Sequence, residues 1–171
     1  MRVRVDELGN KRRVFGLDLD RQWAVQAVAE ALDGEVEALA GTLSLRALSG
    51  GVMVSGDLRA VVRRACDRCL SAVHHTLGGD LDLYFEAEPL AGDVNVSLTP
   101  DELDVGFTER GELDLAAVIS EFFVLESSAR LRCGDPGVRR LEPGDCSVGT
   151  TDEESVPVAA SPFGALKDFE A

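Results

Sequence analysis

Four cysteines are the residues of this sequence whose type and spacing could do chemistry. Cys66 and Cys69 form a Cys-x-x-Cys motif, and Cys133 and Cys146 follow far along the chain. Two thiolates separated by two residues in a tight turn can bind one tetrahedral metal ion. The residues before Cys66 alternate as in a strand, so the motif is predicted to lie in a turn between strands. The four cysteines are therefore a candidate structural zinc site, provided that the later pair folds back onto the motif.

Other interpretations of the same cysteines stay open. Cys66 and Cys69 could be the pair of a thiol oxidoreductase, although such a pair usually opens a helix and residues 70–73 do not clearly do so. Four reduced thiols without a metal are a further interpretation, whereas a disulfide is disfavoured in a reducing compartment. His74 and His75 follow closely enough to replace a distant cysteine as a metal ligand, but a strand histidine is more often a surface residue.

A cluster of arginines is the second feature that could bind a ligand. It consists of Arg59, Arg63, Arg64 and Arg68, and strand alternation puts Arg59 and Arg63 on one face. One interpretation is a solvated strand face that pairs with the chain's own carboxylates. The other is an edge that binds phosphate or a partner, and a direct RNA-binding module would use Arg63, Arg64 and Arg68.

The sequence carries none of the motifs that mark common enzyme classes. It has no GxSxG, no Walker-type phosphate loop, no HExxH and no GxGxxG. Its paired carboxylates lie in acidic, loop-like stretches, whereas a general acid needs a buried carboxyl with a shifted pKa. We therefore expect a protein that is not an enzyme.

Charge is divided unevenly along the 171 residues, whose net charge is −14. Residues 1–75 contain 11 basic and 10 acidic side chains, whereas residues 76–171 contain 6 basic and 21 acidic ones. Such a chain repels nucleic acid at long range, so a basic protein is the easier partner for the second half. No apolar run reaches the length of a signal peptide or a membrane span, and a cytoplasmic protein is expected.

Alternating apolar residues predict strands, and helical spacing of apolar residues predicts two helices. The predicted strands include residues 35–48, 52–62, 73–77 and 81–85, and the predicted helices cover 21–32 and 115–127. Ser49-Gly50-Gly51 is a hairpin turn, and Gly78-Gly79 is expected to interrupt a strand. Asp20 and Asp114 are the predicted helix N-caps.

These elements predict one α+β domain over residues 1–130, with a mainly antiparallel β-sheet and two principal helices. Residues 131–171 are rich in Gly, Pro, Ser, Thr, Asp and Glu, and they also contain Cys133 and Cys146. They are predicted to be an irregular C-terminal segment that ends in a short apolar motif.

Several short motifs follow one another in a characteristic order. Cys66-Asp67-Arg68-Cys69-Leu70 comes after a strand-rich part, and Glu112-Leu113-Asp114-Leu115 leads into the apolar residues 119–125. Cys133 and Cys146 come next, and Ser161-Pro162-Phe163-Gly164-Ala165-Leu166-Lys167 stands near the end. In this order the chain resembles the YceD family, the large ribosomal RNA subunit accumulation proteins.

The resemblance implies a cytoplasmic bacterial protein that supports synthesis, processing or stability of the large-subunit (23S) ribosomal RNA. It attaches no catalytic activity to the chain, in agreement with the missing active-site motifs. Combined with the acidic charge, it leads us to expect a ribosomal protein or a large-subunit assembly factor as the partner, with direct contact to nucleic acid as the less favoured alternative.

Overall fold

The computed structural model describes residues 1–9, 11–87, 105–144 and 146. The predicted apolar motif at residues 161–167 lies outside this part of the chain. The described residues form the expected α+β fold, with two helices and a mostly antiparallel sheet.

The elements follow one another along the chain with long strands in the first half. The strands are β1 (Arg2–Arg4), β2 (Arg13–Leu17), β3 (Glu35–Leu48), β4 (Gly51–Ala65), β5 (Ala72–Ala87), β6 (Val105–Thr108), β7 (Glu112–Asp114) and β8 (Val138–Arg140). The helices are α1 (Gln22–Leu32) and α2 (Leu115–Glu126), with a short 3-10 turn at Val5–Glu7.

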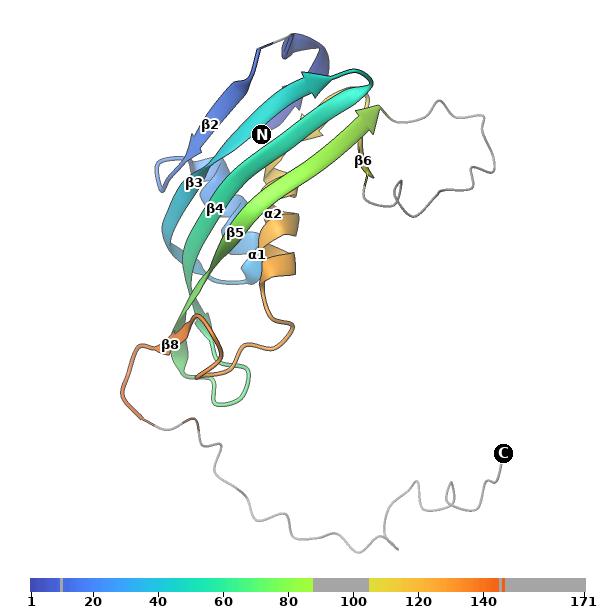
Figure 1. The fold of residues 1–171 in the computed structure, drawn as a ribbon. Coiled ribbons are helices and arrows are strands. Elements are labelled where there is room, and N and C mark those ends of the chain that lie inside the picture. The colour runs from blue at the N-terminus through green and yellow to red at the C-terminus, as the bar shows by residue number, and fades with distance from the viewer. Residues whose placement is uncertain (10, 88–104, 145, 147–171) are drawn as a thin grey trace, which may run out of the picture.

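The main sheet has the strand order β2-β3-β4-β5-β6, and β8 pairs with the first residues of β5. Every pair is antiparallel except β5 with β6. Strands β1 and β7 form a separate two-stranded sheet. Helices α1 and α2 cover one face of the main sheet, whereas β8 and the loops around it lie at one end of the long strands (Figure 1). Residues 138–140 of the predicted irregular segment therefore form a strand, and the domain boundary at residue 130 stays a prediction.

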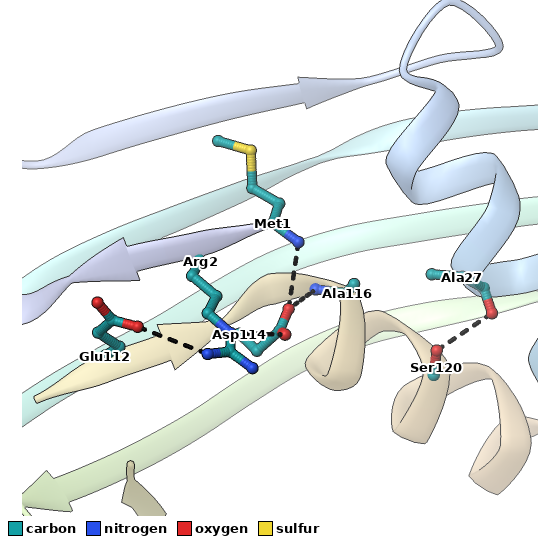
Figure 2. A network of polar contacts seen from close by, with 7 residues as sticks. All are labelled: Met1, Arg2, Ala27, Glu112, Asp114, Ala116 and Ser120. Atoms are coloured by element: carbon teal, nitrogen blue, oxygen red, sulfur yellow. Dashed lines mark hydrogen bonds and ion pairs between the residues drawn. The ribbon is translucent and has the colours of Figure 1, made fainter. Parts of the chain in front are cut away.

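The core lies between the helices and the sheet. The side chains of Phe123, Leu58 and Val28 are fully buried there, and Phe122 packs edge-on against Phe123 with ring centroids 5.1 Å apart. Helices α1 and α2 approach each other closely enough for the Ser120 hydroxyl to donate to the carbonyl of Ala27 at 3.1 Å (Figure 2). The apolar periodicity of both helices therefore faces the sheet, as the sequence predicts.

The predicted hairpin between β3 and β4 is confirmed, but the predicted interruption at Gly78-Gly79 is wrong, because β5 runs unbroken from Ala72 to Ala87. Gly78 has a φ of 152°, and a Cβ on it would overlap the backbone carbonyl of Leu58 on β4. Gly41 on β3 stands in the same relation to the carbonyl of Asp57. These glycines let neighbouring strands approach closely, rather than ending a strand.

The two predicted N-caps have different outcomes. The Asp114 carboxylate accepts from the backbone N–H of Ala116 at 3.0 Å, and the amino group of Met1 donates to the same carboxylate at 3.3 Å (Figure 2). Burial alone would raise the pKa of Asp114, but these donors outweigh it and lower the pKa. The prediction for Asp20 is wrong, because α1 begins at Gln22 without any side-chain cap and Asp20 itself donates its N–H to Asp18.

Candidate metal centre

The four cysteines, which come from three separate parts of the chain, meet at the end of the sheet that carries β8. Cys66 follows β4 directly, Cys69 lies in the turn before β5, Cys133 follows α2, and Cys146 follows β8. Their sulfur atoms all lie within 4.8 Å of one another. The later pair therefore folds back onto the Cys-x-x-Cys motif, as a four-thiolate site requires.

The sulfur–sulfur distances fit a tetrahedral site. The sulfur of Cys66 lies 3.8 Å from that of Cys146, and the sulfur of Cys69 lies 3.6 Å from that of Cys133. A tetrahedron with metal–sulfur bonds of about 2.3 Å has sulfur–sulfur edges of about 3.8 Å. All four cysteines are free thiols in the structure. The arrangement can hold one metal ion with little movement of the ligands.

Two tight turns position the sulfur atoms. In the first, the N–H of Leu70 donates to the carbonyl of Cys66 at 2.9 Å, and Leu70 has a φ of 58°. In the second, Gly134 directly follows Cys133 and has a φ of 89°. In both turns the residue after a cysteine takes the left-handed conformation, which turns the chain sharply around the sulfur atoms.

Backbone N–H groups stabilise negative charge on Cys66. Burial raises the pKa of this thiol, but hydrogen bonds from the N–H groups of Cys69, Arg68 and Cys133 outweigh burial and lower the pKa to about 6. Burial and the sulfur atoms of Cys66 and Cys69 instead raise the pKa of Cys133 to about 12. Four neighbouring thiolates repel one another, so only a bound cation can hold all of them ionised together.

The residues around the cysteines form a small unit that we call the cysteine lobe, namely residues 63–75, 127–144 and Cys146. Its core holds few apolar side chains, because only Val73 and Leu131 are buried beside Cys66. Asp67 fastens the two parts of the lobe, since its N–H donates to the carbonyl of Leu131 and its carboxylate accepts from the Leu131 N–H. A core this small needs a further source of stability, and a metal ion bound by the four sulfurs would supply one.

The two histidines are not brought into the metal site. His74 pairs with the carboxylate of Glu37 on β3, and His75 is buried where β5 pairs with β8. Neither belongs to the group of metal-ligand atoms around the four sulfurs. Burial, and then the charge of Arg64, lowers the pKa of His75, so the imidazole stays neutral near neutral pH.

The sequence-predicted arginines divide into two groups. Arg59 pairs with Asp57 at 3.2 Å and Arg63 with Glu35 at 3.6 Å, so these two contact the chain's own carboxylates. Arg64 donates to the hydroxyl of Ser127 at 3.3 Å. Arg68 instead lines a hollow on the cysteine lobe.

Two further arginines, Arg130 and Arg132, line that hollow together with Arg68. They could not be grouped with Arg68 from the sequence, because they stand more than sixty residues from it. They flank Leu131, whose side chain is buried in the lobe and whose backbone pairs with Asp67. The only local signal for the position of Arg130 and Arg132 is that they stand on both sides of one apolar residue, Leu131.

A second hollow, of about 850 Å³, lies at the opposite end of the sheet and is mainly acidic. Its lining includes the aromatic rings of Phe85 and Phe107, and Phe107 is 48% exposed. The charged residues around it are Arg2, Arg110, Glu109, Glu112, Asp114 and Glu121. Arg2 already pairs with Glu112 and Asp114, as Figure 2 shows. The other charged side chains of the lining are the exposed Glu109, Glu121 and Arg110.

Neither helix of the described residues is long and apolar enough to cross a membrane. Comparison with curated proteins and with solved structures gave no match. Comparison with protein families gave one for residues 54–170, to the family described as "Large ribosomal RNA subunit accumulation protein YceD". The matched residues include all four cysteines, together with Arg130 and Arg132. They also make up well over half of the chain, which therefore belongs to the YceD family.

Proposed function

We propose that this chain is a non-enzymatic, cytoplasmic ribosome-biogenesis factor that supports synthesis, processing or stability of the large-subunit (23S) ribosomal RNA. The observation that carries the proposal is the family match over residues 54–170, whose description names accumulation of that RNA. The described hollows support a binding role, because both lie open at the surface and neither combines a nucleophile with a base.

Zinc is the metal that we propose for the cysteine lobe. Four thiolates in a tetrahedral arrangement are the ligand set of structural zinc sites, and a closed set of four leaves no position for a substrate. When bound, the ion would neutralise part of the thiolate charge and join the turn at Cys66 to the turn at Cys133. Its role is therefore to build the lobe, without a part in catalysis.

The thiol oxidoreductase alternative finds less support. Cys66 and Cys69 lie in a turn between two strands, not at the start of a helix. The pKa of Cys66 is lowered to about 6, but its side chain is fully buried and out of reach of a protein disulfide. Hydrogen bonds with Ser71 lower the pKa of Cys69 as well, and the sulfur of this half-buried residue lies 3.6 Å from that of Cys133. Its sulfur also lies beside three others, an arrangement that suits a metal ion better than a redox pair.

A basic ribosomal protein or a large-subunit assembly factor is the partner that we propose for the acidic hollow. Glu109 and Glu121 would attract lysine or arginine side chains, and the exposed ring of Phe107 would supply an apolar and cation–π contact. Ribosomal proteins are rich in such side chains, so the chemistry of the hollow agrees with the family's role.

Reversing the charge of the hollow is expected to weaken this contact. The double variant Glu109→Lys and Glu121→Lys should retain less than about a tenth of the protein that the wild-type chain captures, because like charges across an interface repel. The probe is the mixture of proteins stripped from purified large subunits, captured on the immobilised chain. The control variant Asp20→Lys and Asp82→Lys has the same net charge. If both double variants captured equally little protein, binding at the acidic hollow in particular would be contradicted.

The role in RNA accumulation is tested by deleting the gene and separating ribosomal particles on sucrose gradients. The expected result is fewer large subunits and an accumulation of incompletely processed large-subunit RNA, both restored by a plasmid copy. An unchanged gradient profile with normally processed RNA would contradict the proposed function.

A further inference from the structure

The cysteine lobe is the basic end of an acidic protein. It contains seven arginines and three carboxylates, against a net charge of −14 for the whole chain. A zinc ion with four thiolates would contribute a charge of −2, so the lobe stays positive with the metal bound. The arginines come from both of its parts and include Arg68 from the first and Arg130 and Arg132 from the second.

Arg68, Arg130 and Arg132 surround one hollow of about 740 Å³. All three side chains are exposed, and the ion pairs of the described residues involve other arginines: Arg2, Arg4, Arg59 and Arg63. Asp67 also lines the hollow, but its carboxylate accepts the N–H of Leu131 at 2.6 Å. Three guanidinium groups thus line the hollow beside a single carboxylate, that of Asp67, and none of the three forms an ion pair among the described residues.

The acidic hollow is too far away to cancel this charge. It includes Phe85 near the end of β5, whereas the lobe contains the first residues of the same strand. Thirteen residues of extended chain span roughly 40 Å, and charges in physiological salt are screened over about 8 Å. An anion at the cysteine lobe is therefore not repelled by the acidic hollow, and it meets three arginines against the one carboxylate of Asp67.

The hollow lined by Arg68, Arg130 and Arg132 is chemically suited to bind phosphate groups rather than nucleobases. Guanidinium groups match phosphate oxygens in shape and charge. The cysteine lobe contains no Phe, Tyr or Trp, so it offers no aromatic platform on which a base could stack. Contacts of this kind fix the position of a nucleic acid without reading its sequence.

We infer that the hollow between Arg68, Arg130 and Arg132 binds the phosphate backbone of ribosomal RNA. The inference rests on the proposed function for the identity of the RNA, and it deepens that function by giving the protein two separate contacts. A basic protein would bind at the acidic hollow and the RNA at the cysteine lobe. The chain would then hold an RNA segment next to a ribosomal protein, which is a direct way to support assembly.

The test uses the full chain, purified without chelator, and a fluorescently labelled hairpin copied from large-subunit ribosomal RNA. Binding is followed by fluorescence anisotropy between about 50 and 200 mM salt, over which three phosphate contacts should weaken binding about 20- to 40-fold. The triple variant Arg68→Gln, Arg130→Gln and Arg132→Gln should bind at least about tenfold more weakly at low salt, with a salt slope smaller by about 2 to 3.

A charge-matched variant separates this site from general electrostatics. We call the described residues outside the cysteine lobe the body of the protein. The substitutions Lys11→Gln, Arg21→Gln and Arg46→Gln remove the same charge from exposed positions on the body, and they should leave the affinity for the RNA within about twofold. Single variants at the three lobe arginines should each lower the salt slope by about one. Equal weakening in both triple variants, or no binding by the wild-type chain at low salt, would overturn the inference.

Complementation distinguishes this inference from the proposed function. We call the triple variant of Arg68, Arg130 and Arg132 the lobe variant, and the triple variant of Lys11, Arg21 and Arg46 the body variant. If the RNA contact and the proposed function both hold, the lobe variant fails to restore large-subunit RNA in cells that lack the gene, whereas the body variant restores it. Full restoration by the lobe variant overturns the RNA contact and leaves the proposed function intact. A lobe variant that fails in cells although the wild-type chain binds no RNA would assign the hollow to an acidic protein, which also overturns the inference. Normal RNA levels in cells without the gene would instead remove the proposed function.

Discussion

Replacing Cys66 with serine is expected to abolish metal binding and to unfold the cysteine lobe. Cys66 is fully buried among the other three sulfurs, and only Val73 and Leu131 are buried beside it. Structural zinc contributes about 10–16 kcal/mol to the folding of small zinc fingers, so the lobe should not stay folded without its metal. The zinc content should fall from one ion per wild-type chain to none in the variant. Limited proteolysis should cut the variant between residues 127 and 146.

The matched control for this experiment is His74→Ala, which removes a potential ligand that the structure places outside the site. It should keep one zinc per chain and the protease resistance of the wild-type lobe. The metal centre would be contradicted if the wild-type chain carried no metal, its four thiols reacted freely and its cysteine lobe still resisted protease.

Replacing Gly78 with alanine is expected to destabilise the body of the protein by about 2–5 kcal/mol. A Cβ at this position would overlap the Leu58 carbonyl on β4, and the φ of 152° is one that L side chains rarely adopt. Strand β4 cannot move away easily, because it is paired with β3 on one side and with β5 on the other. The measurement is the free energy of unfolding from denaturant titration.

Gly16→Ala provides the comparison on an outer strand. A Cβ on Gly16 meets no atom within 4 Å, and no left-handed conformation is required there. The variant should be unchanged or more stable by up to about 1 kcal/mol, because alanine restricts the unfolded chain. If the Gly78 and Gly16 variants had similar free energies of unfolding, the close contact between β4 and β5 would not be what requires glycine at position 78.

The parts of the fold that the sequence predicts correctly are those with strong local signals. The hairpin at Ser49-Gly50-Gly51 is flanked by long alternating strands, and Asp114 precedes a strongly apolar helix. At Gly78-Gly79 the same reasoning fails, because glycine promotes turns in an isolated chain but here allows close contact with a neighbouring strand. That neighbour comes from a distant part of the sequence, so a local window contains no information about it.

The candidate site likewise combines residues with a local sequence signal and residues that are brought together only by tertiary contacts. Cys66 and Cys69 are recognisable from their spacing, whereas Cys133 and Cys146 could join them only on the condition that the later segment folds back, which the sequence does not decide. The hollow beside them depends on Asp67 contacting Leu131, a tertiary contact that carries Arg130 and Arg132 to Arg68. Arg59 and Arg63 lie closer to Arg68 in sequence, but the strand places them beside carboxylates of the body.

The central claim is that this chain supports accumulation of large-subunit ribosomal RNA, and the ratio of large- to small-subunit ribosomal RNA tests it most directly. The measurement follows this ratio over time in cells depleted of the protein, with the wild-type gene or an empty vector supplied in trans. The account predicts that the ratio falls with the empty vector and stays normal with the gene. A ratio that stays the same in both cultures after the protein has disappeared would contradict the claim.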